Sequence, residues 1–140
     1  MTQVVLDTNV ILAALLSQRR AAFEILQRLR RGEFQIALSN RLLIEYEEVL
    51  KRNAVDLART HEDVDRFLNA ICQAADFFQL PPAHPPRLLD SDDEPLLRLA
   101  ETSGARLITT HYLRHLRPAS AHGVVVLLPR EFLRMLSAKQ

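Results

Sequence analysis

The sequence of 140 residues has a single cysteine, no tryptophan and no apolar run long enough to cross a membrane. Because Cys72 is alone, an internal disulfide and a cysteine-based zinc site are both excluded. The N-terminus also lacks a basic region followed by an apolar stretch and a cleavage site, so no signal peptide is predicted. We therefore expect a cytoplasmic protein of bacterial or archaeal type that does not associate with membranes.

An excess of charge of one sign is also absent, because 18 basic residues accompany 17 acidic ones and the formal net charge is +1. This balance excludes neither a nucleic acid nor a protein partner, since the distribution of charge matters more than its sum. Lysine is scarce, and the arginines gather at 19–31 and 106–134. Arginine is the better bidentate phosphate ligand, although genome composition explains such an excess equally well.

Short apolar runs alternate with segments whose apolar residues recur about every 3.6 positions. Strands are predicted at 3–6, 34–38, 106–109 and 124–127, with a weaker one at 77–80 and a brief strand or loop at 87–89. Helices are predicted at 9–16, 21–30, 41–52, 61–75, 96–103 and 130–136. This alternation predicts an α/β fold, a three-layer sandwich with a central parallel sheet of about four to five strands and helices on both faces. The length suits one domain, 1–140.

Asp7 ends the first predicted strand and stands directly before a helix. The carboxyl ends of parallel strands are where α/β folds place their chemistry. A carboxylate at this point is either the N-cap of the helix or a ligand for a hard cation. The choice depends on whether other carboxylates reach the same edge of the sheet.

Two further acidic features occupy comparable places. Glu45 lies in the helix after the second strand, and an acidic run begins the helix before the third clear strand: Asp90, Asp92, Asp93 and Glu94. In a parallel sheet these positions share one face, and carboxylates that converge there repel one another unless a cation compensates them. Oxygen ligands suit Mg²⁺ or Mn²⁺, so the convergence predicts metal-assisted phosphodiester hydrolysis. Taken singly, each acid is also explained by a solvated helix face or by the helix dipole.

Four motifs follow one another along the chain: Leu6-Asp7-Thr8-Asn9-Val10, Ile44-Glu45-Tyr46-Glu47-Glu48-Val49-Leu50, Asp90-Ser91-Asp92-Asp93-Glu94-Pro95-Leu96-Leu97 and Leu107-Ile108-Thr109-Thr110-His111. In this order they resemble the PIN-domain ribonucleases. The segment 124–136, with Pro129-Arg130-Glu131-Phe132-Leu133, resembles the ending of the VapC-like subgroup, the toxins of toxin–antitoxin systems.

The resemblance implies a central parallel sheet and an endoribonuclease site that uses Mg²⁺ or Mn²⁺. It carries the metal ligands over as Asp7, Glu45 and one of the pair Asp93 and Glu94. Matching the family motif without gaps favours Glu94 as the third ligand. Asp93 is the competing choice, and Asp92 is less favoured than either. Supporting positions are Thr8, Asn9 and Ser39.

The fourth acidic position departs from the family pattern. Thr-Gly-Asp is common there, whereas this chain has Thr110-His111-Tyr112. Neither His111 nor Tyr112 replaces a carboxylate as a ligand for Mg²⁺. A one-metal enzyme, a weaker enzyme and a catalytically silent PIN-like module that binds RNA or protein are the alternatives.

The resemblance also implies an RNA substrate, a cognate antitoxin protein and a homodimer. An apolar set on the first helices is the predicted interface, with the competing interpretation that it faces the sheet: Leu12, Leu15, Leu16 and Phe23. A receiver-like phosphoaspartyl domain is disfavoured, because it needs an acidic pair beside the first strand and a late lysine. Only Asp7 follows that strand, and Lys139 is the only late lysine.

Overall fold

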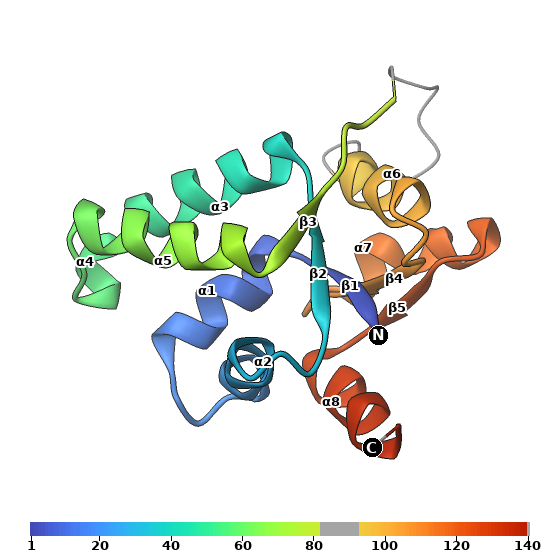
Figure 1. The fold of residues 1–140 in the computed structure, drawn as a ribbon, viewed down its shortest axis with the longest axis horizontal. Helices are drawn as coiled ribbons and strands as arrows, with labels where there is room; N and C mark the ends of the chain where they lie inside the picture. The colour runs from blue at the N-terminus through green and yellow to red at the C-terminus, as the bar shows by residue number, and fades with distance from the viewer. Residues whose placement is uncertain (82–92, 140) are drawn as a thin grey trace.

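The computed structural model describes residues 1–81 and 93–139 (Figure 1). Five strands form one parallel sheet in the order β3-β2-β1-β4-β5. The strands are β1 (Gln3–Leu6), β2 (Gln35–Leu38), β3 (Ala75–Phe77), β4 (Leu107–Thr109) and β5 (Val125–Leu127). The apolar side chains of β1 are fully buried, as expected for a central strand covered on both faces.

The described part of the chain contains eight α-helices and one 3₁₀ helix. They are α1 (Thr8–Leu16), α2 (Ala21–Arg30), α3 (Asn40–Arg52), α4 (Ala54–Leu57), α5 (His61–Gln73), α6 (Glu94–Thr102), α7 (Leu113–Leu116), η2 (Arg117–His122) and α8 (Pro129–Ala138). Helices α1, α2, α3 and α5 lie on one side of the sheet, and α6 and α7 lie on the other (Figure 1). Right-handed crossovers in this strand order require that arrangement. The predicted α/β fold is confirmed. Among the described residues, no helix has the length and apolar character needed to span a membrane.

The strand order reverses at β1, which lies between β2 and β4. Val4 is in register with Ile36 of β2, and Leu6 is in register with Thr109 of β4. The backbone N–H of Asp7 donates to the Thr109 carbonyl at 2.9 Å, one residue beyond the end of β1. Asp7 therefore lies where parallel sheets open a crevice between strands that continue in opposite directions.

The third strand is the main correction to the predicted elements. It was expected at 77–80 but occupies Ala75–Phe77, where it pairs in register with β2, and α5 accordingly ends at Gln73 instead of continuing to residue 75. The last rung of the ladder is the Phe78 N–H, which donates to the Leu38 carbonyl at 2.8 Å. The short helices α4 and α7 were not predicted, because four residues are too few to establish a helical period. The element expected at 87–89 lies outside the described residues.

Candidate active site

Asp7 is a buried carboxylate with its hydrogen bonds satisfied, and 9% of the residue is exposed. Its Oδ1 accepts from the Thr8 backbone N–H at 2.8 Å, which makes Asp7 the N-cap of α1. Its Oδ2 accepts from Asn9 Nδ2 at 2.9 Å and from the Thr110 hydroxyl at 2.8 Å. Burial raises the pKa of Asp7, and these hydrogen bonds act against that rise.

Glu45 reaches the same place through Thr8. The Thr8 hydroxyl donates to Glu45 Oε2, and the Thr8 backbone N–H donates to Asp7. Thr8 itself is buried, while Glu45 is partly buried on α3. One residue at the start of α1 therefore holds both carboxylates, although they stand 38 positions apart in the sequence.

Tyr46 is buried close to the two carboxylates, a role that the sequence did not reveal. Its side chain is fully buried, and its hydroxyl donates to the Leu6 carbonyl at 2.5 Å. Burial, followed by the charges of Asp7 and Glu45, raises the pKa of Tyr46 well above its ordinary value. The sequence identified Tyr46 only as part of the apolar side of the helix at 41–52. The available signal was its hydroxyl, since a buried tyrosine usually finds a hydrogen-bond partner.

The third acidic feature stands at the start of α6, the helix whose first turn lines a cavity with Glu45. Asp93 is the N-cap residue of α6, Glu94 is the first residue of that helix, and both are partly buried. A cavity of about 20 Å³ separates the start of α6 from α3, and its walls include Glu45 and Pro95. In residues 1–81 and 93–139, no group of three or more acidic, histidine or cysteine side chains is arranged to hold a metal ion.

The structure therefore joins Asp7 to Glu45 and places the N-terminus of α6 next to Glu45. The assignment of the third ligand to Asp93 or Glu94 stays a prediction, and Asp92 lies outside the described residues. Asp7, Glu45 and this third acid offer only carboxylate oxygens, which are the donors that Mg²⁺ and Mn²⁺ prefer. The chemistry of the side chains present fits a hard divalent cation.

Neutral groups occupy the fourth position of the site. Thr110 is fully buried and, besides donating to Asp7, accepts from Asn9 Nδ2 and from the Tyr112 N–H, both at 3.1 Å. The His111 N–H donates to Asn9 Oδ1 at 2.9 Å. Asn9 and Thr110 thus contact the Asp7 carboxylate directly, whereas His111 contacts it only through Asn9.

The Tyr112 side chain turns away from this network. It is 60% exposed, and its ring packs against His115 with the ring centroids 5.9 Å apart. The pKa of His111 is lowered, mainly by burial and then by the charge of Arg20. Among the described residues, no carboxylate takes the place of the fourth acid.

Ser39 supports the site indirectly, through the helix that carries Glu45. Its buried hydroxyl accepts from the Leu42 N–H at 3.2 Å and caps that helix, α3.

The side chains of the predicted homodimer interface differ in exposure. Leu12 and Leu15 are partly buried and pack against the core, Phe23 is partly buried, and Leu16 is 47% exposed.

A comparison with protein families matches residues 3–112 to the PIN domain. The matched span includes all of the predicted acidic ligands and the Thr110-His111-Tyr112 segment, and it ends before η2. The segment at 129–133, on which the resemblance to the toxin subgroup depends, lies beyond it. A comparison with curated proteins finds no significant match. Because the match covers most of the chain and agrees with the observed sheet, this protein belongs to the PIN-domain family.

Proposed function

We propose that this protein is a metal-dependent endoribonuclease, and that it is the toxin of a toxin–antitoxin pair. PIN-domain proteins are generally nucleases, and they typically bind Mg²⁺. The observation that carries the proposal is the bridge from Asp7 through Thr8 to Glu45, at the point where the strand order reverses. Two carboxylates held by one residue in this crevice suit a cation that is also in contact with phosphate.

In this proposal Asp7, Glu45 and one of Asp93 and Glu94 hold Mg²⁺ or Mn²⁺. When bound, the cation supplies Lewis acidity to the phosphodiester and to the attacking water. The remaining residues keep the ligands in place before the cation binds. Asn9 and Thr110 hold the Asp7 carboxylate from one side, and Thr8 holds Glu45 from the other.

Glu45→Gln should strongly lower the rate of RNA cleavage. Removal of a group that only supports a metal ligand already costs about 10–100-fold, and we expect removal of a ligand to cost at least as much. The measurement is cleavage of a mixed RNA pool by the purified protein with Mg²⁺, with Mn²⁺ and with EDTA. Glu48→Gln is the matched control, because Glu48 is exposed and lies one turn further along α3. Cleavage that persists in EDTA, or that survives Glu45→Gln at the wild-type rate, would contradict the proposal.

The third ligand is tested by comparing Glu94→Gln with Asp93→Asn. We expect the larger loss of cleavage from Glu94→Gln, and we expect its activity to depend on a higher Mn²⁺ concentration than the wild type needs. A larger loss from Asp93→Asn would instead assign the ligand to the N-cap residue of α6. Circular dichroism of both variants separates loss of a ligand from loss of the helix.

The partners proposed with this function are an RNA substrate, a cognate antitoxin protein and a second copy of the chain in a homodimer. If the toxin assignment is correct, expression of the wild type without an antitoxin slows bacterial growth and expression of Glu45→Gln does not. Equal growth of the two strains at matched protein levels would contradict the toxin assignment and leave the nuclease assignment to the cleavage assay.

A second candidate is a catalytically silent module that binds RNA or protein. The neutral fourth position favours it, because Thr110, His111 and Tyr112 offer no carboxylate there. The absence of cleavage with either metal, from folded protein free of any partner, would favour this candidate over the nuclease.

A further inference from the structure

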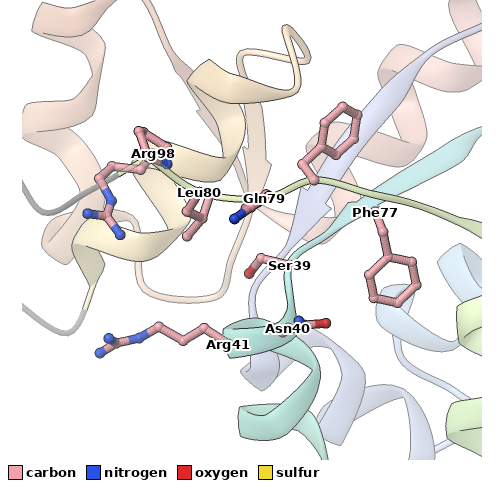
Figure 2. Close-up of a pocket in the computed structure, with 9 residues that line it drawn as sticks. Ser39, Asn40, Arg41, Phe77, Gln79, Leu80 and Arg98 are labelled. Atoms are coloured by element: carbon pink, nitrogen blue, oxygen red, sulfur yellow. The ribbon is translucent and has the colours of Figure 1, made fainter.

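A pocket of about 490 Å³ lies beside the proposed active site, between the start of α3, the segment after β3 and α6 (Figure 2). Its volume falls within the range of about 300–1,000 Å³ that is usual for pockets that bind small ligands. The pocket is not part of the carboxylate cluster, and Ser39 is the one predicted site residue that lines it. Its lining combines two arginines, polar groups and apolar side chains.

The two arginines are available to bind an anion. Figure 2 shows that Arg41 from α3 and Arg98 from α6 extend toward the same side of the pocket. Among the described residues, neither guanidinium forms an ion pair, and the buried Nε of Arg98 has no hydrogen-bond partner. Arg28, by contrast, pairs with Glu24, and Arg66 pairs with Asp63. A planar guanidinium matches the geometry of phosphate oxygens and binds them in a bidentate manner.

The rest of the lining suits a ribose and an unpaired base. The Ser39 hydroxyl and the Gln79 amide point toward the side on which the arginines lie (Figure 2). Leu80 adds an apolar surface, and Phe77, which is 46% exposed, adds an aromatic ring at the other end of the lining. Single-stranded RNA presents unstacked bases to such surfaces, whereas the bases of a duplex are paired and stacked.

Arg41 lies between the pocket and the proposed active site. Arg41 lines this pocket and also the small cavity that contains Glu45. Both residues are on α3 and are four positions apart, so their side chains lie on the same face of the helix. Helix α6 contributes to both spaces as well, with Pro95 in the small cavity and Arg98 in the pocket.

We propose that this pocket is an RNA subsite that binds the nucleotide adjacent to the bond that is cleaved. Arg41 and Arg98 bind backbone phosphates, and Leu80 and Phe77 contact the ribose and an unpaired base. The inference rests on the proposed ribonuclease function, because that function supplies RNA as the ligand. To that function the inference adds the form of RNA that is bound, which is single-stranded, and the residues that bind it.

The test measures binding without cleavage. Fluorescence anisotropy of a fluorescein-labelled oligouridine is followed in EDTA over a range of KCl concentrations, for the full chain and its variants. Arg41→Ala and Arg98→Ala should each raise Kd about tenfold at low salt. Each should also reduce the slope of log K against log[KCl] by about 0.7, the contribution of one phosphate contact on a single strand. Arg52→Ala, an exposed arginine at the other end of α3, is the matched control and should change neither quantity.

The outcomes separate this inference from the proposed function. Loss of affinity in both pocket variants, with Arg52→Ala unchanged, supports the subsite even when no metal supports cleavage. Wild-type affinity and salt slope in Arg41→Ala and Arg98→Ala overturn it, whatever the cleavage assay gives. Tighter binding of a matched RNA duplex, or of labelled oligoglutamate, also overturns it, because the pocket would then serve another ligand. Thermal unfolding of each variant confirms that the compared proteins are folded.

Discussion

Asp7→Asn abolishes RNA cleavage while leaving the fold intact; this is the largest effect that we expect from a single substitution. Asn has nearly the shape of Asp, so its side-chain oxygen still accepts from the Thr8 N–H and caps α1. What is lost is the negative charge on which cation binding depends, together with the second oxygen that accepts from Asn9 and Thr110. We expect cleavage to fall by more than about 100-fold, the upper end of the loss seen when only a group supporting a ligand is removed.

The same substitution changes the pH dependence of stability. Burial raises the pKa of Asp7 in the folded protein above its ordinary value of about 3.9. The stability contributed by protonated Asp7 is therefore fully present below about pH 4 and is lost as the pH rises through the folded-state pKa. Asp7→Asn cannot ionise, so the stability of the variant relative to the wild type should increase across this interval. Urea unfolding at a series of pH values measures the difference.

Metal addition gives a third readout for Asp7. A cation that binds only the folded protein stabilises it by about 2.7 kcal/mol at a concentration of 100 times Kd. Mn²⁺ should therefore raise the melting temperature of the wild type, and it should do so much less in Asp7→Asn. Asp56→Asn, on the exposed side of α4, is the control and should retain both the shift and the cleavage. Cleavage by Asp7→Asn at the wild-type rate would contradict the assignment of Asp7 as a metal ligand.

Tyr46→Phe should destabilise the protein by about 1–3 kcal/mol, because it leaves the buried Leu6 carbonyl without its side-chain donor. For a chain of this length, the melting temperature falls by about 3–10 °C. The carbonyl belongs to the residue before Asp7, so we also expect slower cleavage, with a smaller loss than Asp7→Asn causes. Tyr112→Phe is the control, since the Tyr112 side chain is largely exposed.

The stability of the protein at alkaline pH tests the burial of the Tyr46 hydroxyl more directly. Its pKa in the folded state is raised by burial and by the charges of Asp7 and Glu45. The stability that neutral Tyr46 contributes is fully present below the unfolded-state pKa of about 10 and is lost as the pH rises above it. The wild type should therefore lose stability above about pH 10 more steeply than Tyr46→Phe does. An equally steep loss in both proteins, or a melting temperature unchanged by Tyr46→Phe, would argue against a buried hydrogen bond to Leu6.

The local sequence determined most of the elements and the edge of the sheet that carries the acids. Apolar runs and helical periods placed β1, β2, β4 and β5 to within a residue. The position of Asp7 after a buried strand predicted both of its possible roles, and the structure shows the N-cap directly. These features follow from local chemistry, because strand burial, helix period and capping each depend on a few neighbouring residues.

Contacts between distant residues were decided only by the tertiary structure. The hydroxyl of Thr8 reaches Glu45, Tyr46 donates to Leu6, and Arg41 shares a pocket with Arg98. None of these pairs has a sequence spacing that encodes it, because the crossovers and the strand order bring them together. The position of β3 was also decided at this level, because its register against β2 fixes where α5 ends. The sequence could name the acids, but only the packing of α3 and α6 around β1 determined which side chains hold and surround them.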